Sequence, residues 1–126
     1  MNKRLIKEFR RLVSIDAPSF GERKMADYLR SRLTELGFSV EEDDAGSLYG
    51  GNCGNLYAFR KGNLPGEPVL FSMHMDTVEP SKGKEAVVLE DGRIVSRGDT
   101  VLGADDMSGV TALLEALEQI REEELP

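Results

Sequence analysis

The sequence has a single cysteine, Cys53, among its 126 residues. A framework of disulfide bonds is therefore excluded, and one free thiol is compatible with a reducing compartment. No apolar run approaches the roughly 20 residues that a membrane-spanning helix needs. The segment 1–8 carries too many charges for a signal peptide. We therefore expect a soluble protein of the cytoplasm, with no membrane as a partner.

Histidine is equally scarce, because His74 is the only one in the chain. Zinc sites usually take three or four protein ligands from His, Cys, Asp and Glu. A zinc site here must therefore be rich in carboxylates or be completed by residues outside the chain. Positive charge is also in deficit: the net charge is −7, with acidic and basic residues interspersed. This balance argues against nucleic acid or an anionic membrane as a partner.

The length and the apolar patterns predict one domain that contains both helices and strands. Three stretches place apolar residues at helical spacing: residues 2–14, a stretch that ends at Gly37, and one that starts near Asp106. Segment 19–22, Ser-Phe-Gly-Glu, has the form of a capping box at the start of the second helix. Strand patterns occupy residues 38–41, 55–60 and 69–73, and two short runs flank the hairpin signal Asp91-Gly92. This order predicts an α/β fold with a mixed β-sheet flanked by helices.

A histidine and an aspartate follow the most apolar of these strands. The run Val69–Met73 is bounded by Pro68 and leads into His74-Met75-Asp76, so it is typical of a buried strand. Alternate side chains of a strand share a face. His74 and Asp76 should therefore point the same way from the strand's C-terminal end, where open α/β sheets bind ligands. A carboxylate in this position can fix the tautomer of a metal-bound histidine, although His74 taken alone is better explained by a buried, hydrogen-bonded role.

A second acidic stretch lies where a loop enters the third predicted helix. Asp105 and Asp106 follow Leu102-Gly103-Ala104 and precede a helical pattern. Taken alone, the pair is better explained by helix capping, because aspartate is a favoured N-cap residue and suits the positive end of the helix. A carboxylate is also a hard anionic ligand that suits the bridge between two cations in a two-metal hydrolase. Both interpretations stay open for this stretch alone.

Together, the two stretches closely resemble the co-catalytic zinc exopeptidases. The matching motifs are His-Met-Asp-Thr-Val at 74–78 and Leu-Gly-Ala-Asp-Asp-x-Ser-Gly at 102–109. The family includes peptidase T, carboxypeptidase G and acetylornithine deacetylase, and the form Thr-x-Leu-Gly-Ala-Asp-Asp is most similar to the peptidase T (tripeptide aminopeptidase) branch. The similarity runs through the whole chain. It implies a metallo-aminopeptidase that hydrolyses short peptides with two zinc ions.

The resemblance also implies roles for individual residues. By position, His74 corresponds to a ligand of the first zinc, Asp76 to the catalytic-site carboxylate that orients this histidine, and Asp105 to the carboxylate that bridges both zincs. Asp106 is not assigned as a ligand, and the family's unusual cis peptide is expected between Asp105 and Asp106. Met107 departs from the pattern, because many relatives have lysine there. Carboxylates and imidazole accept zinc, manganese and cobalt, so the metal's identity stays open.

The length departs more strongly from the family. Members are several-fold longer, and their Glu-Glu pair, later ligands and lid or dimerisation domain have no counterpart here; Glu122–Glu124 only continues a helix. We therefore expect residues 1–126 to be the N-terminal part of a peptidase T-like catalytic domain that alone binds zinc weakly and is inactive. The alternatives are a truncated, non-catalytic product that folds and self-associates, and an unrelated binding module with chance motifs. We also expect a homo-oligomer, since the missing strands would leave an unpaired edge.

Overall fold

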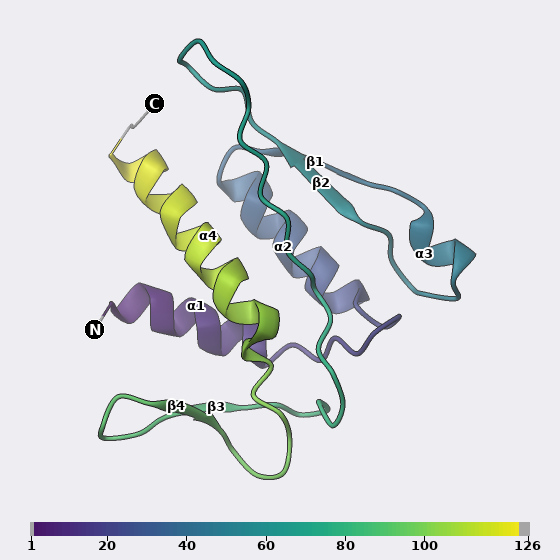
Figure 1. Ribbon diagram of the computed structural model, residues 1–126, viewed down its shortest axis with the longest axis vertical. Helices are drawn as coiled ribbons and strands as arrows, with labels where there is room; N and C mark the ends of the chain where they lie inside the picture. The colour runs from purple at the N-terminus through teal and green to yellow at the C-terminus, as the bar shows by residue number, and fades with distance from the viewer. Residues whose placement is uncertain (1, 124–126) are drawn as a thin grey trace.

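The computed structural model describes residues 2–123, and Figure 1 shows the arrangement of its helices and strands. In chain order the elements are α1 (Lys3–Val13), α2 (Arg23–Glu35), β1 (Ser39–Glu42), α3 (Ala45–Leu48), β2 (Leu56–Phe59), β3 (Ala86–Val88), β4 (Ile94–Ser96) and α4 (Ala104–Glu122). The predicted α/β class is confirmed. The long helices lie where apolar spacing predicts them, and the short α3 lies between the strands predicted at 38–41 and 55–60.

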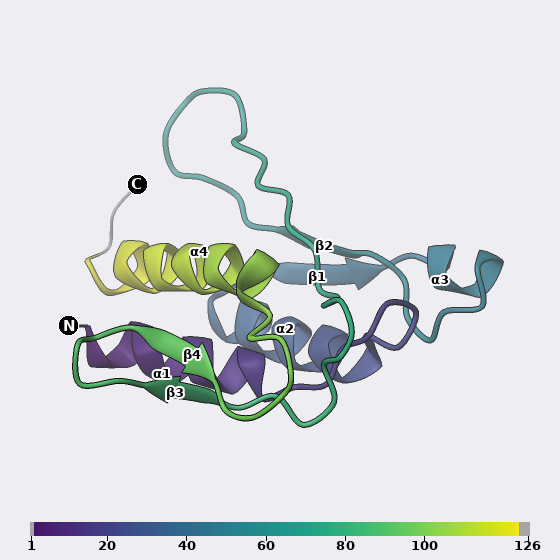
Figure 2. The same cartoon turned by 60° about the horizontal axis from the view of Figure 1, so that its bottom comes forward.

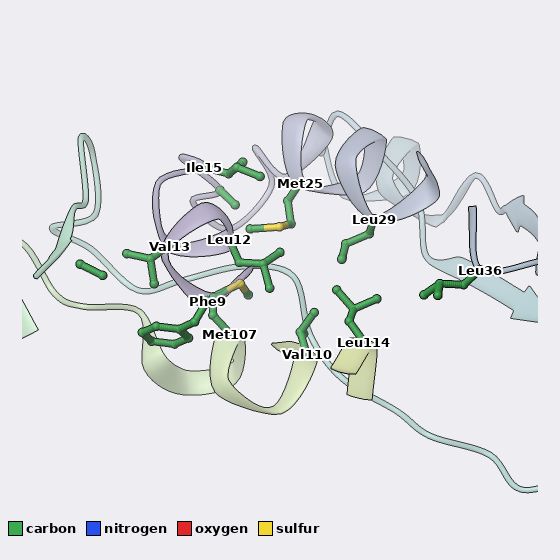
Figure 3. Close-up of a cluster of buried hydrophobic side chains, with 12 residues drawn as sticks. Phe9, Leu12, Val13, Ile15, Met25, Leu29, Leu36, Met107, Val110 and Leu114 are labelled. Atoms are coloured by element: carbon green, nitrogen blue, oxygen red, sulfur yellow. The ribbon is translucent and has the colours of Figure 1, made fainter. Parts of the chain in front are cut away.

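The three long helices enclose the core. Buried apolar side chains come from one face of each helix, and Figure 3 shows them converging. They include Phe9, Leu12 and Val13 of α1, Met25 and Leu29 of α2, and Met107, Val110 and Leu114 of α4. Around this core, the Arg4 guanidinium of α1 donates to Glu115 of α4, with Nε 2.8 Å from Oε2. The helices therefore form a packed layer that supports the loops between them.

The two ends of α2 differ in how well the sequence predicted them. Gly37 has φ 87°, and the Phe38 amide donates to the carbonyl of Leu33, so glycine ends the helix in the left-handed conformation as predicted. The predicted capping box is wrong. The helix begins at Arg23, and Glu22 Oε1 accepts the amide of Phe20. Ser19 makes a different contact, described below.

The paired strands form two separate antiparallel ladders. β1 pairs with β2 from Ser39 opposite Phe59, and β3 pairs with β4 from Ala86 opposite Ser96. In Figure 2 the β3–β4 hairpin lies beside α1, and β1 and β2 lie on the side of α2. A single parallel bridge joins Pro18 to Thr77. Parallel and antiparallel contacts therefore both occur, but one continuous sheet does not form among residues 2–123.

The predicted buried strand at Val69–Met73 is the main correction. This segment belongs to no strand, and Val69, Leu70 and Phe71 are 78%, 90% and 60% exposed. In Figure 1 it runs as an extended trace between α4 and the β1–β2 ladder. An apolar run indicates the tendency to form a strand but does not supply its partners, and no strand of the described chain pairs with this segment.

Within residues 2–123, no helix combines the length and apolarity needed to cross a membrane.

Candidate metal-binding site

His74 lies between two aspartates, one at each ring nitrogen. Its Nδ1 is 3.0 Å from Oδ1 of Asp76 and 3.1 Å from the Asp76 carbonyl oxygen. Its Nε2 is 3.0 Å from Oδ1 of Asp105, which is 31 positions away in the sequence. The predictions that His74 and Asp76 point together, and that Asp105 approaches His74, are confirmed as geometry. Their roles at a metal stay predictions.

The electrostatics of the histidine follow from these contacts. The hydrogen bond to Asp105 is the main cause that raises the pKa of His74, partial burial opposes it, and the bonds to Asp76 add to the rise. Two acceptors of Asp76 face Nδ1, so a proton on this nitrogen is well held. Nε2 faces one carboxylate oxygen, and imidazole nitrogen and carboxylate oxygen are both ligand atoms for zinc. The ring is thus oriented with Nε2 toward Asp105.

Asp105 reaches His74 because the backbone at the start of α4 departs from helical geometry at Gly103 and at Asp105. Gly103 has φ 73°, and a Cβ there would come within 2.9 Å of the Thr77 side chain, so this glycine permits a close approach of the two loops. Asp105 has φ −91° and ψ 108°, which is not helical geometry. The peptide between Asp105 and Asp106 is cis, as expected from the resemblance. Asp105 therefore stands outside the regular helix with its side chain at the histidine.

The neighbours of Asp105 make different contacts. The Asp106 carboxylate lies against Gly109, where a Cβ would come within 2.3 Å of Oδ1. Asp106 therefore lies over the first turn of α4. Met107, the departure from the family pattern, is fully buried in the core. Its side chain therefore contributes to the packing of α4 against the core.

Two contacts that hold the segments around His74 in place are not predicted by the sequence. The Ser19 hydroxyl donates to Oδ2 of Asp76 at 2.5 Å across 57 positions, and this bond is the main cause that lowers the pKa of Asp76. The buried Lys84 ammonium donates to Thr77 Oγ1 at 3.1 Å and to the Ile15 carbonyl at 3.3 Å, and burial lowers the pKa of Lys84. The Ser19–Asp76 and Lys84–Ile15 bonds have no local sequence signal, because they join residues 57 and 69 positions apart.

The donor atoms fit a zinc ion in kind but not in number. Two ligands at normal zinc bond lengths in a tetrahedral site lie about 3.3 Å apart, and His74 Nε2 and Asp105 Oδ1 are 3.0 Å apart. The Asp105 side chain is 96% exposed, which leaves its outer face open. Among residues 2–123, however, no group of three or more His, Cys, Asp or Glu side chains is placed to hold a metal ion. The described chain therefore offers two ligands of the three or four that zinc takes.

Over nearly its whole length, the chain is similar to peptidases. It is 35% identical to a tripeptidase from Staphylococcus aureus subsp. aureus Mu50, whose crystal structure matches 98% of this chain with a TM-score of 0.94. It is 37% identical to the aminopeptidase PepT from Bacillus cereus ATCC 10987, whose structure matches 98% of the chain with a TM-score of 0.93. These identities and scores show a shared fold and a peptidase T-like portion.

Two sequence relatives also match most of the chain. The chain is 39% identical over 123 residues to the protein YqjE of Bacillus subtilis (strain 168), covering 98% of this chain. It is 30% identical over 122 residues to the cytosol non-specific dipeptidase of Escherichia coli (strain K12), covering 86% of this chain. It spans 33% of YqjE and of each of the two solved structures, and 23% of the dipeptidase. No protein-family model matches the sequence.

Proposed function

We propose that the chain is the N-terminal, metal-binding part of the catalytic domain of a peptidase T-like aminopeptidase that hydrolyses short peptides. The observation that carries the proposal is the placement of His74 between Asp76 and Asp105, with Nε2 and Oδ1 of Asp105 at the separation of two ligands of one cation. The similarity to a tripeptidase and to PepT supports the same conclusion.

In this proposal each of the three side chains has a separate task. His74 would hold zinc through Nε2, and Asp105 would hold it through its carboxylate, the outer face of which is exposed. Asp76 keeps the proton on Nδ1 and so leaves the Nε2 lone pair available for the metal. When bound, zinc supplies a Lewis acid for the scissile carbonyl and an acidified water as the nucleophile. By the family resemblance, a glutamate outside residues 1–126 would take the proton of that water.

The remaining ligands and the base would come from the rest of a longer protein. This chain spans a third of the peptidases of known structure that it matches. With two ligands, the isolated chain should hold zinc weakly and should not turn over peptides. A second candidate is a non-catalytic protein that folds and self-associates, and the exposure of the unpaired apolar residues Val69, Leu70 and Phe71 favours it.

Metal titration of matched variants tests the proposed site. We expect zinc binding in the micromolar range or weaker by calorimetry, and its loss in His74→Ala and in Asp105→Asn. Asp99→Asn is the control, because Asp99 is an exposed acidic residue of the same loop region and should leave binding unchanged. Circular dichroism of each variant verifies folding.

Two results would contradict this reasoning. Zinc binding that survives both His74→Ala and Asp105→Asn would place the metal elsewhere. Tight stoichiometric zinc with turnover of a tripeptide by the purified 126-residue chain would show that the site is complete without further residues. Parallel assays on a longer gene product, where one continues past residue 126, should show the activity that the fragment lacks.

A further inference from the structure

We propose that Ser19, in the loop between α1 and α2, is a positioning residue of the candidate metal site. It holds the Asp76 carboxylate so that His74 keeps its proton on Nδ1 and presents Nε2 toward Asp105. The part of this inference that concerns a metal rests on the proposed function. The part that concerns the histidine ring does not, so the two can fail separately.

The geometry divides the Asp76 carboxylate between two partners. Oδ2 accepts the Ser19 hydroxyl at 2.5 Å, and Oδ1 lies 3.0 Å from Nδ1 of His74. Rotation of the carboxylate about its Cβ–Cγ bond would break both contacts. The Asp76 side chain is 34% exposed, so packing alone does not immobilise it. The hydroxyl therefore supplies the restraint that orients the carboxylate toward the ring.

The backbone that carries Ser19 is held in place by other bonds. The Thr77 amide donates to the Ala17 carbonyl at 2.9 Å, and Pro18 and Thr77 form a parallel bridge. Lys84 adds bonds to Ile15 and Thr77 on the same two segments. Removing the Ser19 hydroxyl should therefore release the carboxylate while the backbone stays in place. This makes a serine-to-alanine change an informative test.

A role for Ser19 in helix capping is excluded by its contacts. Capping requires the side-chain oxygen of the N-cap residue to accept a backbone amide of the first turn. The helix α2 begins four residues after Ser19, at Arg23, its N-cap residue is Glu22, and no side chain forms a cap hydrogen bond there. The local hydrogen bond before the helix is made by Glu22, whose carboxylate accepts the Phe20 amide at 2.6 Å. The side chain of Ser19 is thus used for the long-range contact and not for the start of the helix.

The single histidine makes the test direct. Nitrogen-15 spectra of uniformly labelled protein contain one imidazole, so the Nδ1-H and Nε2-H tautomers of His74 are read without assignment. On metal-free protein at a pH where the ring is neutral, Asp76 at Nδ1 and Asp105 at Nε2 compete for the proton, so we expect both tautomers in the wild type and an increased Nε2-H share in Ser19→Ala. Ser19→Thr keeps a hydroxyl and should restore the wild-type ratio. Ser14→Ala removes a hydroxyl that bonds only to the Arg11 carbonyl and is the matched control.

Zinc affinity, measured by competition with a chromophoric chelator, supplies the second readout. Changes to outer-sphere partners typically cost about 10–100-fold in metal affinity; because Ser19 acts through Asp76, we expect a loss of about 3–10-fold in Ser19→Ala and no loss in Ser14→Ala. In an Asp76→Ala background, Ser19→Ala should change nothing further. A folded Ser19→Ala protein with wild-type tautomers and wild-type affinity would overturn the inference. A shifted tautomer in a protein that binds no zinc would support the positioning role and overturn the proposed metal site.

Discussion

Replacing Gly103 by alanine should destabilise the protein and displace Asp105 from His74. Gly103 directly precedes α4 and has φ 73°, a conformation that side chains with a Cβ rarely adopt. A Cβ at this position would lie 2.9 Å from Thr77 Cγ2 and 3.3 Å from Lys84 Cε. Both neighbours are buried, and Lys84 is bonded to Thr77, so neither can withdraw freely. The added methyl must therefore push the loop away from Thr77.

The expected loss of stability in Gly103→Ala has two parts, and the same substitution at a second glycine allows them to be measured separately. An alanine in the left-handed region costs about 1–2 kcal/mol, and forcing a methyl into a packed contact costs about 1–3 kcal/mol more. Gly98 lies in the same loop at φ 78° with nothing within 4 Å of its would-be Cβ. Gly98→Ala should therefore lower the free energy of unfolding only by the backbone cost, about 1–2 kcal/mol. Gly103→Ala should lower it by the backbone cost and the packing cost together.

Urea denaturation followed by circular dichroism measures the two free energies of unfolding, and chelator competition measures zinc affinity for the same proteins. We expect Gly103→Ala to unfold at lower urea than Gly98→Ala and to bind zinc more weakly, since Asp105 follows Gly103 by two residues. Equal losses of stability in the two variants would refute the close approach of this loop to Thr77. Unchanged zinc affinity in a clearly destabilised Gly103→Ala protein would refute the link between that approach and the placement of Asp105.

Two further predictions concern charge and association. The bonds from Arg23, the Gly54 amide and Arg30 lower the pKa of Glu42 to about 2, so its stabilisation is complete above its ordinary pKa and is lost as the pH falls toward 2. Urea titrations should show an acid-dependent loss of about 1–2 kcal/mol from this group, after allowance for solvent screening, that is missing in Glu42→Gln. Self-association through the unpaired apolar segment should appear in sedimentation at micromolar concentration and be weakened by Leu70→Glu. It should persist in Leu48→Glu, whose leucine is 75% exposed elsewhere, in α3; a strictly monomeric wild type would contradict this mode of association.

Much of the site was predictable because its sequence signals are local. The two-residue spacing of His74 and Asp76 on extended backbone puts both side chains on one side without any knowledge of the fold. The helices follow from apolar spacing, and Asp91-Gly92 marks the β3–β4 turn, where Gly92 has φ 88°. The approach of Asp105 to His74 was different, since it came from the family resemblance and not from spacing.

What the sequence left undetermined depends on contacts between distant segments. Ser19 followed by Glu22 has the pattern of a cap, yet a carboxylate 57 positions away takes the hydroxyl. Nothing near Lys84 in the sequence indicates that it is buried against Ile15 and Thr77. The run at 69–73 has the composition of a buried strand, but whether a strand is buried depends on neighbouring strands that its own residues do not specify.

The geometry at His74 does not depend on pairing of the strand that leads to it. Residues 69–73 are exposed and unpaired, yet His74 keeps both carboxylates at 3.0 Å. The restraints come instead from the two sides of the site. On one side the α1–α2 loop holds Asp76 through Ser19, and on the other side Gly103 lets the loop before α4 approach Thr77 closely, with Asp105 at His74. The contacts that bring His74, Asp76 and Asp105 together therefore come from loops and helices and not from a paired strand.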